Sequence, residues 1–261
     1  MKLLHCLFLL VFLHSNAFGQ TPYTLDIKKE VVLFGGGIAA SSLGLLYRAK
    51  TPLFTDEEIL QLDIQNINRF DREATRFFST KAHSASNYFW YGSHLLPLLF
   101  LADKESLSDI VEIGTMYGEA AIITTGLTLL TKYSVRRARP FNYDPNTGLD
   151  KKQTSNAKGS FFSGHTSLTS VNCFFMAKVF SDYFPESKWR PVVWSVAAAI
   201  PAVTGYLRVR GGKHYPTDVI VGYAVGAGVG LLIPQLHKSV KQENNMSLSI
   251  GYNSALLSWK F

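Results

Sequence analysis

Long apolar runs separated by short polar stretches make up most of the chain and predict helices. We expect an all-α fold, a helical bundle of about five or six core helices that associates with a membrane and holds its active site at one end. The apolar stretches that would supply these helices are Val31 to Tyr47, Tyr88 to Ala102, Ile110 to Thr131, Leu168 to Phe180, Val192 to Leu207 and Val219 to Leu236.

Three further segments have a different pattern. Thr55 to Thr80 is polar with spaced apolar positions, which predicts an amphipathic helix lying on the bundle or on the bilayer. Asn142 to Ser160 combines lysines with Asn, Asp, Pro and Gly, as is typical of an exposed loop. At the C-terminus, Ser247 to Phe261 alternates in two short runs about Asn253 and Ser254, which predicts a hairpin that packs as a tail.

The first nineteen residues have the features of a secretory signal peptide. Lys2 precedes an apolar run from Leu3 to Leu13, and small residues from Ala17 to Gly19 favour cleavage before Gln20. Cleavage removes one lysine and no acid, so the formal net charge falls from +7 to +6. Cys173 is then the single remaining cysteine, which excludes an intramolecular disulfide.

The sequence is compatible with more than one arrangement of the apolar stretches relative to a membrane. A spanning helix needs about 20 mostly apolar residues, and some stretches are shorter or contain acids such as Glu112 and Glu119, which in a bilayer must face the bundle interior. If the signal is cleaved and all six stretches cross, Lys132 faces the cytoplasm. A periplasmic site requires that Val31 to Tyr47, interrupted by three glycines, does not cross, or that the bundle is soluble or peripheral. We expect a membrane-associated protein with a periplasm-facing site.

Three short segments that contain basic residues or histidine stand at the edges of apolar stretches, so one end of a bundle can hold all of them. They are Lys132 to Pro140, Phe162 to Ser167 and Leu207 to Asp218. Cleavage of a phosphate ester needs cations for the negative oxygens, a nucleophile for phosphorus and a proton for the leaving oxygen. Lys132 and Arg139 are seven residues apart, which places them on one face if their segment is helical.

The second and third segments supply the remaining groups. Ser163 is a good helix cap, and Gly164 lets an anion approach the free amides of that helix, with His165 beside it. In the third segment, Asp218 falls in the first turn of a helix and can reach back to His214. A carboxylate on one imidazole nitrogen fixes the tautomer and leaves the other nitrogen free as nucleophile or base.

The order of these motifs is Lys, six residues, Arg-Pro; then Ser-Gly-His; then Arg, five residues, His, three residues, Asp. Over residues 109–236 this resembles the type 2 phosphatidic acid phosphatase and vanadium haloperoxidase superfamily. The resemblance implies that His214 is the nucleophile that forms a phosphohistidine, that Asp218 orients it, and that His165 is the general acid. The phosphate cradle that it implies consists of Lys132, Arg139, Ser163, Gly164 and Arg208.

Two positions depart from the family pattern. Phe162 stands where proline usually precedes Ser-Gly-His, and Leu207 stands where serine usually precedes the arginine of the third motif. Neither change removes a proton carrier or a nucleophile. We therefore expect activity to be retained, with a less defined substrate preference.

The other basic residues predict no chemistry. Arg136, Arg137 and Arg210 are expected at the surface or at lipid headgroups. His83 and His94 have no partner pattern and are expected to be structural. No cluster has the ligand spacing of a zinc or two-metal site, so we expect no metal and no cofactor.

The prediction is a metal-independent phosphatase for phosphate monoesters or diphosphates of lipids, in the phosphatidate or polyprenyl diphosphate class. The alternatives are a soluble periplasmic acid phosphatase of broad specificity and a haloperoxidase with vanadate as its cofactor. Expected partners are a phosphorylated lipid or small phosphoester and a membrane, but no nucleic acid, for which no motif is present; the oligomeric state is not determined. The predicted regions are 1–19 (signal peptide), 20–108 (N-terminal helices), 109–236 (catalytic core) and 237–261 (tail with a short hairpin).

Overall fold

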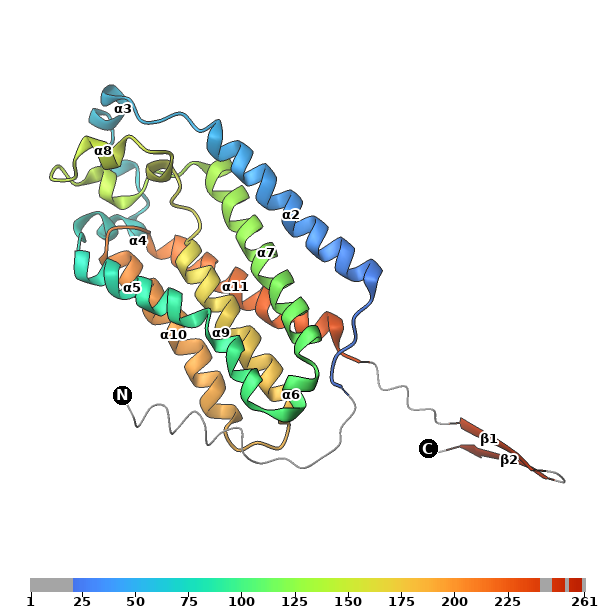
Figure 1. Cartoon of the computed structure of the whole chain (residues 1–261). Helices are drawn as coiled ribbons and strands as arrows, with labels where there is room; N and C mark the ends of the chain where they lie inside the picture. The colour runs from blue at the N-terminus through green and yellow to red at the C-terminus, as the bar shows by residue number, and fades with distance from the viewer. Residues whose placement is uncertain (1–20, 240–245, 252–253, 260–261) are drawn as a thin grey trace.

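The computed structural model describes residues 21–239, 246–251 and 254–259, so the predicted signal peptide lies outside the described residues. The described chain is a helical bundle followed by one short β-hairpin, which confirms the predicted all-α class (Figure 1). The long helices are α2 (Ile27–Ala49), α5 (Thr80–Ser93), α7 (Ile110–Val135), α9 (Gly164–Tyr183), α10 (Arg190–Arg210) and α11 (Pro216–His237).

Short helices and a hairpin complete the described chain. The two strands of the hairpin pair antiparallel, with Met246 opposite Trp259, in the region where the sequence predicts a hairpin. The short α-helices are α3 (Asp56–Leu60), α4 (Arg69–Arg72), α6 (Lys104–Ser108) and α8 (Leu149–Lys152), and the strands are β1 (Met246–Gly251) and β2 (Ser254–Trp259). The 3₁₀ helices are η2 (Ile64–Asn66), η3 (Glu73–Arg76), η4 (Leu96–Ala102), η5 (Pro140–Tyr143) and η6 (Ser155–Lys158).

The predicted amphipathic helix over Thr55 to Thr80 is wrong. Thr55, Asp63 and Asn68 each accept hydrogen bonds from backbone amides just after them and so start a new short helix. Because side chains of this kind compete with a continuous helix, the segment breaks into four pieces. The segment 142–160 also differs from the predicted exposed loop, since it contains short helices and buries Lys158.

Helix α9 lies at the centre of the bundle and contacts α5, α7, α10 and α11. Most of its side chains are buried. The glycines of α11 allow this packing: a Cβ atom on Gly226 would lie 2.1 Å from the carbonyl oxygen of Ser167, and one on Gly222 would lie 2.7 Å from that of Ser163. Small residues at four-residue spacing thus let the two backbones touch.

Helix α2 packs against α7 in the same way. A Cβ atom on Gly44 would lie 2.6 Å from the amide nitrogen of Leu130, and one on Gly126 would lie 2.8 Å from the carbonyl oxygen of Gly37. The glycines of α2 therefore do not interrupt the helix; two of them are buried against α7. The opposite face of α2 exposes large apolar side chains, among them Ile27 and Val32.

Four segments of the described chain are long and apolar enough to cross a membrane, judged by length and composition. Helix α5, with 14 residues, and the central α9 are not among them. Glu119 is buried in the bundle, as expected of an acid in such a helix, whereas Glu112 is half-buried. The four segments are Ile27–Ala49, Ile110–Tyr143, Arg190–Arg210 and Pro216–His237.

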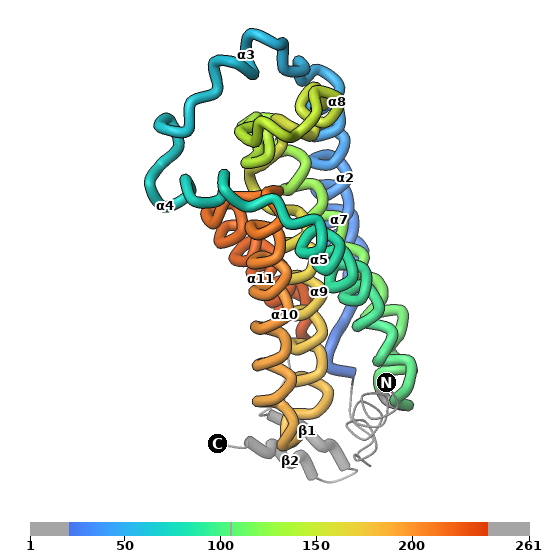
Figure 2. The backbone as a smooth tube through the Cα atoms, turned by 90° about the vertical axis from the view of Figure 1, so that its left-hand side faces the viewer, coloured from blue at the N-terminus to red at the C-terminus, as the bar shows by residue number. Residues whose placement is uncertain are grey.

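The long helices alternate in direction, so the three predicted motif segments meet at one end of the bundle. Helices α7 and α10 end there, and α9 and α11 begin there (Figure 1). Figure 2 shows α3, α4 and α8 gathered at this same end. Tyr23 and Lys238 pair by a β-bridge at the opposite end.

Candidate active site

Residues from five elements converge at this end of the bundle. Lys132 lies in the last turn of α7, Ser163 caps α9 and Arg208 lies in the last turn of α10. His214 lies in the loop between α10 and α11, and Asp218 lies in the first turn of α11. The loop reverses sharply at Gly212, whose φ of 66° is the left-handed conformation that favours glycine.

Arg139 reaches the site by a different route from the predicted one. Helix α7 ends at Val135, and Arg136 adopts a left-handed conformation with a φ of 53°. Arg139 therefore lies on extended backbone and not on the helix face of Lys132. Its guanidinium donates to the carbonyl oxygens of Asn156 (2.8 Å) and Lys213 (3.0 Å) and is buried.

Arg139 fixes the protonation of the His214 ring. Its Nη1 lies 3.2 Å from His214 Nε2, and because a guanidinium can only donate, Nε2 must accept with its lone pair. The ring proton is then on Nδ1, which lies 3.5 Å from Asp218 Oδ2. Burial and the positive charges of Arg139 and Lys132 hold the pKa of His214 well below its usual value, so the ring is neutral.

The carboxylate of Asp218 is held on every side and is fully buried. Oδ2 accepts from Ser160 Oγ (2.5 Å) and from the amide of Tyr215 (3.0 Å). Oδ1 accepts from Arg137 Nη1 (2.6 Å). These contacts fix the direction of the carboxylate toward His214.

Arg137 was expected at the surface, and this expectation is wrong. It pairs with Asp218 and, through Nη2, with Asp71 at 2.6 Å, while its guanidinium stacks on the Tyr215 ring, 3.9 Å from the centroid. Asp71 in turn accepts from the hydroxyl of Thr217. Sequence reasoning missed Asp71, because its partners are far away in the chain. Arg136 and Arg210 are exposed, as expected.

Arg208 and His83 form a second pair in the site. Arg208 Nη1 donates to His83 Nδ1 at 2.8 Å and to Ser86 Oγ at 3.2 Å, and its Nε has no hydrogen-bond partner among the described residues. Burial and the charge of Arg208 lower the pKa of His83 to about 4. His83 is therefore a neutral acceptor for Arg208; the sequence predicted a structural histidine but did not identify this partner. His94 is structural as predicted, with Nδ1 bonded to the carbonyl oxygen of Trp90.

Lys132 and the start of α9 form the floor of the site. Lys132 Nζ donates to the carbonyl oxygens of Gly159 (2.9 Å) and Ser160 (3.3 Å) and is buried. A Cβ atom on Gly164 would lie 3.1 Å from Thr128 Cγ2, so the glycine lets the start of α9 approach α7 closely. Ser163 caps α9 and bonds to the Thr166 hydroxyl at 2.8 Å.

His165 stands in the first turn of α9 and contacts α5. Its Nε2 lies 2.9 Å from Asn87 Oδ1, and its ring stacks on Trp90 at 4.5 Å between centroids. An amide oxygen only accepts, so Nε2 carries a proton in this arrangement. Burial and the charges of Arg208 and Arg139 lower the pKa of His165 to about 2. Asn87 was not predicted, because nothing in its local sequence distinguishes it.

The predicted cations therefore outnumber the acids around His214. Lys132, Arg139 and Arg208 are all buried there, and the carboxylate of Asp218 is already paired with Arg137. Buried positive charge is costly unless an anion balances it. The arrangement fits a phosphate group. Phe162 and Leu207, the two departures from the family pattern, are buried and half-buried respectively, and both lie beside cradle residues in the chain.

Comparison with known proteins agrees with this geometry. The sequence model of the PAP2 superfamily matches residues 113–241. Undecaprenyl-diphosphatase of Sulfolobus acidocaldarius is 26% identical over 153 residues, which cover 58% of this chain and 65% of that protein. Lipid A 1-phosphatase of Rhizobium johnstonii is 38% identical over 120 residues, covering 42% of this chain and 43% of that protein. The chain thus spans less than two thirds of the length of each of these relatives.

A solved structure also resembles this chain. The PAP2-type phosphatidylglycerolphosphate phosphatase of Bacillus subtilis superposes with a TM-score of 0.47 at 16% sequence identity. The superposition covers 77% of this chain and 95% of that one.

Proposed function

We propose that this chain, whose residues 113–241 match the model of the PAP2 superfamily, is a membrane phosphatase that removes phosphate from a lipid phosphate or diphosphate through a phosphohistidine on His214. The observation that carries the proposal is the lone pair of His214 Nε2, held by Arg139 at 3.2 Å inside a buried cluster of cations. A neutral imidazole whose second nitrogen faces a carboxylate is a competent nucleophile.

The first chemical step forms one bond and breaks one. The substrate's negative oxygens take the donors of Lys132, Arg139 and Arg208, which frees His214 Nε2 to attack phosphorus. The bond from phosphorus to the leaving oxygen breaks, and His165 gives that oxygen a proton. As positive charge grows on the ring, the hydrogen bond from His214 Nδ1–H to Asp218 becomes shorter and stronger. Hydrogen bonds that are long in a free site often tighten in this way in the reacting complex.

In the second step, water hydrolyses the phosphohistidine and His165 acts as the base. His165 takes a proton from water, the water oxygen attacks phosphorus, and the bond to Nε2 breaks to release phosphate. The low pKa of His165, about 2, is that of the free site. The negative charge of bound phosphate offsets the arginines that depress it, so the proton on His165 is stabilised when substrate is present.

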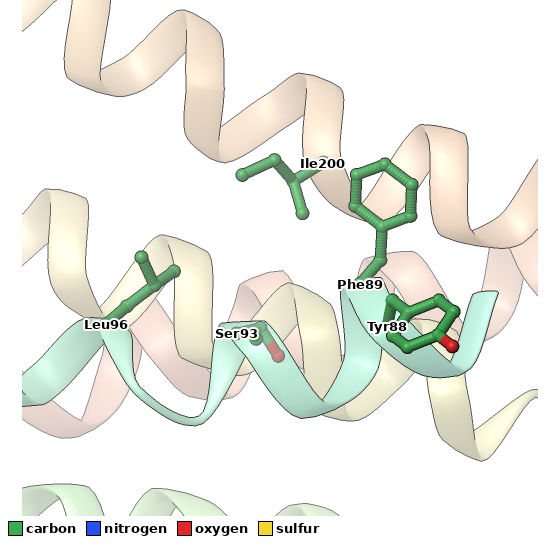
Figure 3. A pocket seen from close by; sticks show the side chains of 6 residues that line it. Tyr88, Phe89, Ser93, Leu96 and Ile200 are labelled. Carbon is green, nitrogen blue, oxygen red and sulfur yellow. The ribbon is translucent and has the colours of Figure 1, made fainter. Parts of the chain in front are cut away.

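An apolar groove beside the site favours a lipid substrate. The groove lies between α5 and α10, has a volume of about 280 Å³, and is lined by almost entirely apolar surface, including Tyr88, Phe89 and Ile200 (Figure 3). Helix α5 contributes Ser86 and Asn87 to the site and, directly after them, Tyr88 and Phe89 to the groove. We propose that a hydrocarbon chain attached to a phosphate in the site lies in this groove.

Trapping the intermediate tests the mechanism. Purified protein in EDTA, quenched during turnover of ³²P-labelled phosphatidate, should retain an acid-labile, alkali-stable label. His214→Asn should retain none, whereas His94→Gln should label like the wild type. A label that survives in His214→Asn would refute the phosphohistidine, and halide oxidation that requires vanadate would favour the haloperoxidase instead.

Filling the groove tests the substrate class. Ile200→Trp should lower kcat/KM for phosphatidate and for a polyprenyl diphosphate at least about tenfold, the effect of losing roughly 1.4 kcal/mol of transition-state binding, while leaving phenyl phosphate hydrolysis unchanged. Val192→Trp, on the same helix outside the groove, is the control. Equal effects on lipid and phenyl substrates would exclude the groove as the lipid path and favour a broad-specificity phosphatase.

We also propose that the site faces the periplasm, as the family resemblance implies. Because Tyr23 and Lys238 pair at the end opposite the site, a spanning bundle with this orientation has both of those residues on the cytoplasmic side. A signal peptide cleaved outside the membrane before Gln20 would give the reverse orientation. Single cysteines at exposed Lys151 and Lys104, in a background in which both Cys6 and Cys173 are replaced by alanine, decide between them: an impermeant maleimide on spheroplasts should label position 151 and not position 104.

A further inference from the structure

A second group of ionisable side chains lies at the opposite end of the bundle. Glu30 in the first turn of α2, Glu119 in α7 and His237 at the end of α11 approach one another there. One ligand atom from each lies within 4.8 Å of the others. The three residues are far apart in the sequence, which is why the spacing of metal-binding motifs did not reveal them.

The ring of His237 is oriented for binding a cation. Its Nδ1 lies 2.9 Å from the carbonyl oxygen of Ile233, which can only accept, so Nδ1 carries the ring proton. Nε2 therefore points toward the carboxylates, 3.0 Å from Glu30 Oε2 and 3.3 Å from Glu119 Oε2. A backbone carbonyl on one nitrogen is the usual support for a histidine that binds metal through the other.

Glu119 lacks the partners that a buried carboxylate needs. Its side chain is fully buried, no described residue outside the group donates a hydrogen bond to it, and its Oε2 lies 3.3 Å from His237 Nε2. Lys29, the neighbour of Glu30 in the chain, instead donates to the carbonyl oxygen of Leu236 at 2.9 Å. Two ionised carboxylates facing the lone pair of a neutral imidazole would carry a charge of about −2, and burying that charge is costly unless a proton or a cation balances it.

We propose that Glu30, Glu119 and His237 bind one divalent transition metal ion of the Zn²⁺ type. Two carboxylates, one imidazole and a 2+ ion are together neutral. Ligands about 2.0–2.1 Å from tetrahedral zinc are roughly 3.3 Å apart, which matches the two distances from His237 Nε2. The imidazole disfavours Mg²⁺ and Ca²⁺, which prefer oxygen ligands.

The bound ion would join three helices. Helix α2 contacts the bundle mainly through α7, and the ion adds a link from its first turn to α7 and α11. The adjacent backbone pairing, from the Thr24 amide to the His237 carbonyl oxygen at 2.8 Å, brings the start of the described chain to the same place. The metal would thus be structural, distant from the phosphate site.

Zinc binding to the purified full chain tests this proposal. Protein stripped with EDTA and dialysed against ZnSO₄ should retain one zinc per chain, and its melting temperature should rise. Glu119→Gln and His237→Asn should each weaken zinc binding at least about tenfold and abolish the rise in melting temperature. The control is Glu112→Gln, which removes another acid of the same helix that lies outside the group and should behave like the wild type.

Two results would overturn the proposal. In the first, the wild-type protein retains no more zinc per chain than the Glu119→Gln variant. The other is zinc that is lost in His214→Asn but kept in His237→Asn, which would place the ion among the histidines of the phosphate site. X-ray absorption of the zinc-loaded wild type gives a further measurement that needs no variant: one nitrogen and otherwise oxygen ligands are expected, and several imidazoles would contradict the assignment.

Discussion

Replacing Arg137 by alanine is the most informative single change at this site. Arg137 pairs with Asp218 and Asp71 at 2.6 Å each, and both carboxylates are fully buried. Removing one partner of a buried ion pair costs about 3–5 kcal/mol, because a charge is left uncompensated. Arg137 itself is 23% exposed, so water can partly replace it. We therefore expect Arg137→Ala to lower the free energy of unfolding by about 3 kcal/mol, the lower end of this range.

The same change should also reduce catalysis. Asp218 keeps the contacts from Ser160 and the Tyr215 amide but loses the one on Oδ1. Removing the carboxylate partner of a catalytic histidine costs about 10⁴-fold in kcat in serine proteases. Arg137 acts one contact further out, and groups in that position typically contribute about 10–100-fold. We expect kcat to fall within that range, with a smaller effect on KM.

The assay compares Arg137→Ala, Arg137→Lys and Arg136→Ala for melting temperature and for kcat on phosphatidate. Arg136 is the matched control, because it is adjacent in the chain and exposed. Lysine retains the charge but cannot bridge both carboxylates, so it should be intermediate. If Arg137→Ala and Arg136→Ala give the same melting temperature and the same kcat, this reasoning is refuted. Arg137 would then behave as the surface residue that the sequence predicted.

Two further predictions concern the cationic pocket and the helix packing. Lys213 belongs to this pocket, because its carbonyl oxygen accepts from Arg139 and its positive charge helps to lower the pKa of His83. Burial and the charges of Arg139 and Arg208 lower the pKa of Lys213 to about 8. The ammonium is charged below that pH and neutral above it, so kcat/KM should fall as pH rises through about 8, and Lys213→Arg should remove that fall in a pH–rate profile. Gly226→Ala places a methyl group against α9 and should destabilise the protein by about 1–3 kcal/mol. Gly228→Ala meets nothing within 4 Å and should leave the melting temperature unchanged or raise it, because alanine is the better helix former. Equal melting temperatures of the two variants would contradict the packing argument.

The sequence alone determined the class of fold and the chemical elements of the site. Apolar runs of helical length predict helices wherever they occur, because burying them is favourable in any arrangement. The order and spacing of Lys132, Ser163, His165, His214 and Asp218 are local properties of the chain, and they were enough to predict a phosphate site at one end of a bundle.

Only the tertiary structure decided which basic side chains pair with which carboxylates. Arg137 was indistinguishable from Arg136 in the sequence, yet one is paired with two buried carboxylates and the other is exposed. Asp71, His83 and Asn87 have no local signal, because their partners lie on other helices. Of the three glycines expected to interrupt the first apolar stretch, Gly37 packs the helix against α7, whereas Gly35 and Gly36 meet nothing within 4 Å. Electrostatic and packing energies depend on distances between segments remote in the chain, and those distances are set only when the helices assemble.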